Sequence, residues 1–362
     1  MKKAIALILA LCMFACLLTA CSAPAKETPA PDTTATTSPE TPPAAEEPAK
    51  TEEAAPAADT GVTGVLDGAP VPSLEGKTIG VAVLGTDHEF DLLAYQGQID
   101  RIKELGGTPV ALDGERDDTK HIADIENLIL QEPDAIIKQL GDASIYEPVM
   151  KKVSEAGIPL FTVDLASQYS ICNSTSDNYA IGATLARTMY ELMGGEGKVA
   201  VFNGFYGVRV CAIRYDMMKY VANDYPNVEF IDPELQDVIT GAADDAYKQT
   251  LDLLTKEPDV KAIWTAWDTP CTGIVRALEE AGRTDVMVFS VDGSSNVLKL
   301  MGNENSPMAC DMAQDAYTIG VAAVDQCARY LAGQSVPSTV YVEPVMVTKA
   351  NYSVSMKELG WE

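Results

Sequence analysis

Short apolar runs alternate with longer amphipathic segments from Lys77 onward, and this alternation organises the chain. The runs are rich in Val, Ile and Ala, which suits strands buried on both faces of a parallel sheet. We expect strands at 78–84, 108–112, 135–139, 159–163, 198–203, 227–231, 261–265, 286–291, 308–313 and 340–347.

The segments between these runs carry apolar residues at helical spacing, as Ile122, Ile125 and Ile129 do. They predict helices at 91–105, 119–131, 144–156, 178–193, 207–223, 241–256, 269–281, 294–302 and 315–332. Strands alternating with helices of this length indicate right-handed βαβ units and parallel sheets. About 275 such residues exceed what one sheet normally organises, so we expect two lobes.

Polar residues stand where several of the predicted strands end. The run Val286–Gly293 reads VMVFSVDG and stops abruptly in Asp292-Gly293. Because open α/β sheets bind ligands at the carboxyl ends of their strands, such residues are candidates for a small-molecule site. Other predicted strands end in the same way, at Gln139, Asp164, Asn203 and Asp268.

The first twenty residues have the pattern of a secretory leader. Lys2-Lys3 precede the apolar segment 4–18, and Leu18-Thr19-Ala20-Cys21 resembles the bacterial lipobox. An ordinary signal peptide with an incidental cysteine is the alternative, but charge, apolar segment and lipobox occur together and in order. We therefore expect a signal peptide at 1–20, lipid attachment at Cys21, and an extracytoplasmic protein anchored to the cell membrane.

Residues 21–75 consist almost entirely of Ala, Pro, Thr, Glu and Asp before Val62. A segment with so few large apolar residues cannot offset the entropy lost on ordering, so we expect a disordered linker stiffened by its prolines.

The net charge of the chain is −27. A chain this acidic is repelled by phosphates, which excludes nucleic acid as a partner. Beyond the leader and Cys21, the cysteines are odd in number and lack any C-x-x-C spacing, so they predict neither a zinc site nor a disulfide framework. We expect no cofactor and no metal, and we expect small buried thiols, with one disulfide left open, at Cys172, Cys211, Cys271, Cys310 and Cys327.

Several motifs in order resemble the periplasmic sugar-binding proteins of ribose-binding type, which are the extracytoplasmic receptors of ABC importers. The resemblance runs from Lys77 to about Tyr352. It is carried by the turn Thr86–Phe90 after the first strand and by four further segments, which are Ile158–Asp164, Ser176–Gly182, Asp268 with Gly273–Leu278, and Ser290–Gly293.

This resemblance implies an α/β protein with two Rossmann-like lobes, each with a parallel central sheet, joined by three crossings and closing on a ligand between them. The N-terminal lobe would comprise 76–177 plus 315–338. The C-terminal lobe would comprise 178–314 plus 339–352. Binding proteins of this family deliver ligand to a membrane permease, and we expect the chain to act as a monomer.

The family's pocket positions imply ligand-binding residues at His88, Phe90, Gln139, Asp164, Asp177 or Asn178, Trp267, Asp268, Asp292 and Gln314, and we add Asp91 and Arg214 as candidates. Carboxylates and amides suit the hydroxyls of a sugar, and aromatic faces suit its C–H face. We assign Trp267 to this pocket and Trp264 to packing, because two residues three apart on a strand cannot point the same way. We also expect Asp292→Ala to lose ligand while the fold survives.

The sequence departs from the family pattern at its arginines. Leu165 stands where the family often has arginine, a second arginine position falls on Ala212, and Arg209 and Arg214 are nearby but displaced. The expected pocket is therefore unusually acidic and aromatic. It admits a sugar, a polyol or a cationic amine held by Asp91, Asp164 and Asp292.

The leading interpretation is a non-enzymatic, lipid-anchored binding protein of an ABC importer that takes a small polar ligand, most readily a sugar. The alternative is a sensor of the same fold that docks on a chemoreceptor or histidine kinase. An enzyme is disfavoured, since no G-x-S-x-G elbow accompanies His88 and the Gly194–Gly197 segment follows a predicted helix, as a helix stop does.

Overall fold

The structure is a computed structural model, and it describes residues 70–361. The leader, Cys21 and all but the last residues of the predicted linker lie outside this range. None of the helices within 70–361 is long and apolar enough to cross a membrane.

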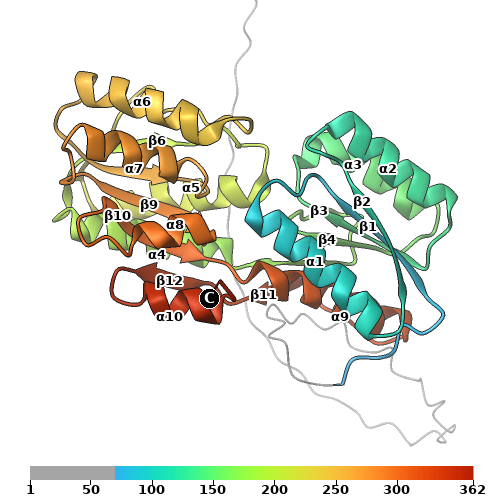
Figure 1. Cartoon of the computed structure of the whole chain (residues 1–362). Coiled ribbons are helices and arrows are strands. Elements are labelled where there is room, and N and C mark those ends of the chain that lie inside the picture. Colours follow the sequence, from blue (N-terminus) through green and yellow to red (C-terminus); the bar gives the residue numbers. More distant parts are fainter. Residues whose placement is uncertain (1–69, 362) are drawn as a thin grey trace, which may run out of the picture. The chain divides into compact units, whose positions relative to one another are not determined.

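The first sheet has six parallel strands in the order β11-β5-β4-β3-β1-β2 (Figure 1). Helices α1 and α9 cover one face and α2 and α3 the other, and the sheet with these helices is the first lobe. The elements are β1 (Thr78–Val83), α1 (Glu89–Glu104), β2 (Thr108–Asp113), α2 (Asp118–Leu130), β3 (Ala135–Gln139), α3 (Ala143–Glu155), β4 (Leu160–Val163), β5 (Cys172–Ser176), α9 (Ala316–Leu331) and β11 (Thr339–Val342).

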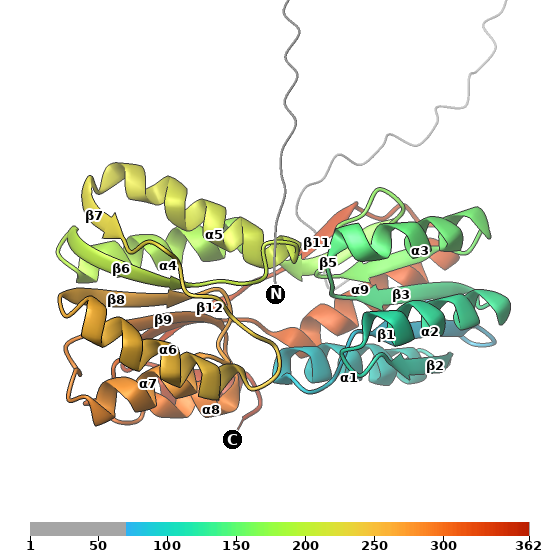
Figure 2. The same ribbon diagram turned by 90° about the horizontal axis from the view of Figure 1, so that it is seen from above.

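The second sheet has the order β12-β10-β9-β8-β6-β7, with β12 antiparallel to β10 and the other neighbours parallel. Helices α4 and α5 cover one face, and α6, α7 and α8 the other (Figure 2), which makes the second lobe. The elements are α4 (Asn178–Leu192), β6 (Glu196–Phe202), α5 (Arg209–Val221), the short 3-10 helix η1 (Ala222–Asp224), β7 (Asn227–Phe230), α6 (Ala242–Lys256), β8 (Val260–Thr265), α7 (Cys271–Glu280), β9 (Met287–Asp292), α8 (Ser295–Leu300), β10 (Met308–Ala313), β12 (Val345–Thr348) and α10 (Tyr352–Glu358).

The predicted α/β architecture with two lobes is confirmed, and one element differs in detail. The run 340–347 was expected as a single strand of the C-terminal lobe. It is two strands, of which β11 pairs with β5 in the first sheet and β12 with β10 in the second. The third crossing between the lobes therefore lies at Glu343-Pro344, because proline cannot donate to a ladder and breaks the run in two.

Two elements had no counterpart among those expected from the sequence. Strand β5 reads CNSTS, which lacks the apolar run of a buried strand, yet every one of its residues is buried. Its side chains make hydrogen bonds instead, as Asn173 does with Thr162 and with the backbone of Leu165. Helix α10 packs against α8 and β12, and Trp361 after it donates to the carbonyl of Gly293 over 3.1 Å.

Close helix packing sets the shape of the first lobe. A Cβ on Gly97 would lie 2.3 Å from the carbonyl oxygen of Tyr317, and one on Gly320 would lie 2.0 Å from that of Ala94. Glycine at both positions therefore lets α1 and α9 approach backbone to backbone. Across residues 70–361 the five cysteines are buried and free, as expected.

Candidate functional site

A cavity of about 270 Å³ lies where the carboxyl ends of strands from both sheets face each other. Strands β1, β3 and β4 of the first lobe end at it, as does β9 of the second lobe. The loop after β6, the segment after β8, helix α5, the loop between β2 and α2, and Gln314 after β10 also line it. Both lobes thus contribute strand ends, which is the placement expected for ligand in open α/β sheets.

Asp292 is the centre of the second-lobe side of the cavity. Its Oδ1 accepts a hydrogen bond from Arg214 Nη1 at 3.1 Å and one from Gln314 Nε2 at 2.7 Å. Burial raises the pKa of this carboxyl to about 7, against the opposing effect of the Arg214 charge. Asp292 has a φ of 122°, an uncommon backbone conformation for a residue other than glycine that aims the side chain at the strand end.

Arg214 is an unusual residue because its guanidinium is buried, with 2% of the side chain exposed. Nε donates to Asn178 Oδ1 at 2.7 Å, and Nη1 donates to the carbonyl of Ala266 at 2.9 Å as well as to Asp292. Buried charges require such pairing and hydrogen bonding. These hydrogen bonds hold the positive charge of Arg214, which α5 carries, beside the cavity.

Asp164 is the corresponding carboxylate at the end of β4, in the first lobe. Its Oδ1 accepts a hydrogen bond from the hydroxyl of Thr175 on β5. Burial raises the pKa of Asp164 to about 6, opposed by the Thr175 hydrogen bond and the charge of Arg214. Asp164 also has a left-handed φ, of 54°. One carboxylate from each lobe therefore reaches the cavity from a strained strand end.

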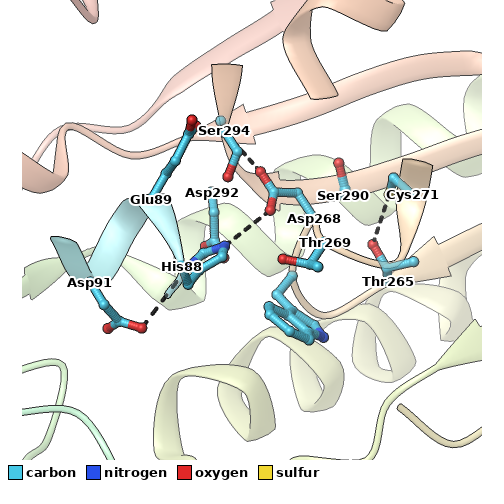
Figure 3. Close-up of polar contacts among 12 residues, drawn as sticks. His88, Glu89, Asp91, Thr265, Asp268, Thr269, Cys271, Ser290, Asp292 and Ser294 are labelled. Atoms are coloured by element: carbon cyan, nitrogen blue, oxygen red, sulfur yellow. Dashed lines mark hydrogen bonds and ion pairs between the residues drawn. The ribbon is translucent and has the colours of Figure 1, made fainter. Parts of the chain in front are cut away.

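His88 of the first lobe contacts the second lobe directly. Its Nε2 lies 3.2 Å from Asp268 Oδ1 and 3.9 Å from Asp292 Oδ2, while Nδ1 lies 4.0 Å from Asp91 of its own lobe (Figure 3). Burial lowers the pKa of His88, but the hydrogen bond and charge of Asp268 together with the charges of Asp292 and Asp91 outweigh it and raise the pKa to about 9. The imidazole is thus a cation in a carboxylate cluster.

His88, Asp268 and Asp292 each place one donor atom within 4.8 Å of the others, a spacing that a metal ion could use. When the imidazole is protonated, it can donate to these carboxylates and the three groups compensate one another's charge. Asp268 also accepts from the backbone N–H of Ser294 at 2.6 Å.

A second contact between the lobes lies beside this cluster. The carboxylate of Glu89 accepts from the backbone N–H and the hydroxyl of Ser295 at 2.5 and 2.8 Å, across from α1 to the start of α8 (Figure 3 shows Glu89 beside neighbouring Ser294). His88 and Glu89 are adjacent, so the turn after β1 holds both contacts.

Aromatic rings form another part of the cavity lining. Trp267 stands edge to face with His88 and with Phe205, with centroids 5.4 Å apart in both pairs. Its Nε1 donates to Asp237 at 3.1 Å, which fixes the ring. Trp264 is fully buried in the core under α4 and α5, so the two tryptophans point as predicted.

Comparison with known protein families identifies the family of this chain. The model of the periplasmic binding protein domain family matches residues 79–335. The chain belongs to the periplasmic binding protein family. The resemblance to its ribose-binding type, drawn from motifs alone, is thereby confirmed.

Individual members of the family support the same relationship. The ribose import binding protein RbsB of Escherichia coli is 26% identical over 75% of this chain and 90% of its own length. Among solved structures, an ABC sugar transporter subunit from Rhodobacter sphaeroides is 50% identical, with a TM-score of 0.76 over 77% of this chain and 100% of that one. An ABC transporter solute-binding protein from Agrobacterium vitis, solved with bound allitol, is 44% identical, with a TM-score of 0.76 over 78% of this chain and 98% of that one.

Eight of the twelve predicted site residues line the cavity, and their role in binding remains a prediction. These are His88, Phe90, Asp91, Asp164, Arg214, Trp267, Asp292 and Gln314.

The other four lie outside the lining, and three of them bond to residues that line it. Gln139 donates to Asp91, Asn178 accepts from Arg214, and Asp268 pairs with His88. Asp177 caps the start of α4 by accepting from the backbone N–H of Ala180. Their role in ligand binding also remains a prediction.

Several lining residues were not predicted, and they correct the expected character of the pocket. Its arginines are not lost, because Arg214 and Arg116 both border the cavity. Arg116 comes from the loop between β2 and α2, where no family motif or strand end drew attention to it. The remaining lining residues that sequence reasoning missed are Leu84, Asp118, Leu140, Gly141, Asp142, Ile145, Gly204, Phe205, Gly207, Val208, Val210, Cys211 and Ile239.

Proposed function

We propose that this periplasmic binding protein is a lipid-anchored extracytoplasmic receptor that closes on a neutral polyhydroxylated molecule, a sugar or sugar alcohol, and presents it to the permease of an ABC importer. The carrying observation is the charge balance of the cavity. It favours the neutral over the cationic ligands that the sequence admits.

Each cavity carboxylate that was expected to grip an amine already has a cation of the chain beside it. Asp292 pairs with Arg214 and lies near His88, and Asp91 pairs with Arg116. The Arg214 charge also acts on Asp164. His88, Arg116 and Arg214 would repel a cationic ligand and so offset much of the attraction of the lining carboxylates, which are Asp91, Asp118, Asp142, Asp164 and Asp292. A neutral ligand with many hydroxyls can accept from the cations and donate to the carboxylates.

The uncharged lining agrees with this ligand class. Phe205 and Trp267 offer apolar ring surface beside the polar groups, an arrangement that suits the C–H face of a polyol. The 44% identical Agrobacterium vitis protein was solved with allitol, which is a neutral hexitol. We therefore favour a polyol or sugar over the amine.

The test is calorimetric titration of the purified chain with allitol, further pentitols and hexitols, ribose, and a diamine of similar size. We expect at least one neutral polyol or sugar to bind without being consumed, and the diamine not to bind. Binding of the diamine alone, or conversion of a ligand at catalytic rates, would contradict the proposal.

Anchoring is tested separately in cells. If Cys21 carries the lipid, labelled palmitate should mark the wild-type chain, and Cys21→Ser should lose the label and leave the membrane fraction. A wild-type chain without label would remove the anchor from the proposal and leave the binding function standing.

A further inference from the structure

The loop between β2 and α2 brings a residue to the cavity that no motif of the chain predicts. We infer that Arg116 is a specificity-determining residue, which donates from its Nη1 to a hydroxyl oxygen of the polyol and so supplies the ligand-binding cation of the first lobe. The inference rests on the proposed function, because it names a further contact of that same cavity.

Two of the three guanidinium nitrogens of Arg116 are already engaged. Nε donates to Asp87 at 2.5 Å, and Nη2 donates to the buried carboxylate of Asp91. Nη1 makes no hydrogen bond to any residue within 70–361, although 83% of the side chain is covered and it borders the cavity. A planar fork held at two nitrogens has a fixed direction for the third.

The partner of Nη2 is itself held in place. Gln139 donates from Nε2 to the backbone carbonyl of Asp91 at 2.9 Å and to its carboxylate at 3.2 Å. Gln98 donates in turn to Gln139 over 2.7 Å. All three residues are buried. This row of side chains leaves little freedom in Asp91, and therefore in the guanidinium, so Arg116 is preorganised for a ligand.

The backbone around Arg116 is strained to place it there. Glu115 and Arg116 both have left-handed φ values, of 56° and 60°. Such conformations are unfavourable for residues other than glycine. The backbone N–H of Arg116 donates to the carbonyl of Leu84 at 2.8 Å, which ties the strained loop to the end of β1.

Gly85 provides the space that the Arg116 side chain occupies. A Cβ on Gly85 would lie 2.7 Å from Cγ, 2.8 Å from Cδ and 2.9 Å from Nε of Arg116. These atoms are in the middle of the arginine side chain, so any larger residue at 85 displaces the guanidinium. Leu165, where the family often has arginine, is fully buried in apolar surroundings and offers no donor.

The charges near Arg116 indicate what Nη1 binds. Asp87, Asp91 and Asp118 lie on the same side of the cavity or at its rim, so a ligand carrying a phosphate or carboxylate would be repelled there. A hydroxyl oxygen accepts a hydrogen bond from the guanidinium without bringing charge. Hydroxyl position and stereochemistry on the ligand would then decide whether it is accepted.

The test measures affinity for the tightest binder in the polyol and sugar panel, and for its monodeoxy derivatives. Arg116→Met should bind that polyol about tenfold to a hundredfold more weakly, as expected for loss of a charged hydrogen bond. Gly85→Ala keeps the charge and displaces it, and should weaken binding in the same direction. The matched control is Arg276→Met, which removes an exposed arginine of α7 that pairs with Asp244 of α6, and this variant should bind as the wild type does.

The deoxy derivatives separate a ligand contact from a structural role. For one derivative, wild type should lose as much affinity as Arg116→Met loses with the parent polyol, and the variant should lose nothing more. If every derivative weakens both proteins equally, or if Arg116→Met and Gly85→Ala bind normally, the inference is wrong and the proposed function stands. If wild type binds no polyol or sugar at all, the proposed function fails and this inference fails with it.

Discussion

The two walls of the cavity are built on opposite plans. The second-lobe wall, made of Asp292, Arg214 and Gln314, is a network in which one carboxylate holds two partners. The first-lobe wall, made of Asp91, Arg116 and Asp164, has two carboxylates that share no partner, since Asp164 accepts from Thr175 while Asp91 accepts from Arg116 and Gln139. Changes in the second wall should therefore disturb the fold as well as binding, whereas changes in the first should act more locally.

The largest effect is expected for Asp292→Ala. From the sequence we expected the fold to survive this change, but the structure argues otherwise because Arg214 is buried against this carboxylate. Removing one partner of a buried ion pair typically destabilises by about 3–5 kcal/mol. Denaturant unfolding should show this loss together with loss of ligand binding.

Asp292→Asn is the companion to this variant, since it keeps the shape and an oxygen that can accept from Arg214 or Gln314. It should retain more stability than Asp292→Ala and still bind ligand weakly. Equal stability of wild type and Asp292→Ala would show that the second-lobe wall is not a coupled network.

A substitution in the core beneath the second-lobe wall should change the stability of the fold without removing a contact to the ligand. Trp264→Ala should lower the unfolding free energy by about 3–5 kcal/mol, because a large buried aromatic leaves a cavity. The matched variant is Trp267→Ala, whose ring is partly exposed in the ligand cavity. Trp267→Ala should lower the unfolding free energy less than Trp264→Ala does, and it should weaken ligand binding more. The reverse ranking would exchange the roles assigned to the two rings.

His88 joins the two walls, and its removal should be visible in the pH dependence of stability. Its pKa is raised from 6.5 to about 9 in the fold, so between these values the folded chain holds a proton that the unfolded chain has released. The contribution of His88 to the free energy of unfolding is fully present below pH 6.5. It falls by about 1.4 kcal/mol per pH unit as pH rises through 9.

His88→Gln should abolish that part of the slope. The carboxylates facing the ring are Asp268, Asp292 and Asp91. The raised pKa of Asp292 adds a slope of its own up to about pH 7, and because the His88 charge lowers that pKa, His88→Gln should move the Asp292 slope to higher pH. Urea unfolding at several pH values between 6.5 and 9 is the measurement. Parallel curves for the two proteins would mean that His88 is not the cation between the walls.

The sequence revealed the second-lobe wall more fully than the first, and the reason is physical. Asp292 of the second-lobe wall ends a buried strand, a position that apolar patterning exposes directly, and in the first-lobe wall only Asp164 has such a position. Arg116 occupies a strained loop, and its direction is set by Asp91, Gln139 and Gly85, which are distant in sequence. No local pattern encodes such a contact.

The fold shows the same division between local and long-range information. Apolar runs and helical spacing predicted the strands and helices that carry their own pattern, such as β3 and α2. Strand β5 was missed because its burial depends on hydrogen bonds to other strands. The split of 340–347 was missed because pairing with two different sheets is decided by tertiary contacts.

The smallest effect is expected for Asp164→Asn, and it tests whether the first-lobe wall acts alone. Burial raises the pKa of Asp164 from 3.8 to about 6, so the folded chain holds an extra proton between those values. The contribution of Asp164 to the free energy of unfolding is fully present below pH 3.8. It is lost as pH rises through 6, by at most about 1.4 kcal/mol per pH unit. Asparagine keeps an acceptor for Thr175 and removes the titration, so the variant should overtake wild type in stability as pH rises through this window.

The ligand affinity of wild type should change in the opposite direction over the same pH range. A ligand hydroxyl that donates to Asp164 favours the ionised carboxylate, so wild-type binding should tighten as pH rises through 6. Unfolding and calorimetric titrations over pH 4–8 measure both slopes. If Asp164→Asn instead lost as much stability as Asp292→Ala, the carboxylate of the first lobe would be as deeply coupled as that of the second, and the contrast between the walls would be wrong.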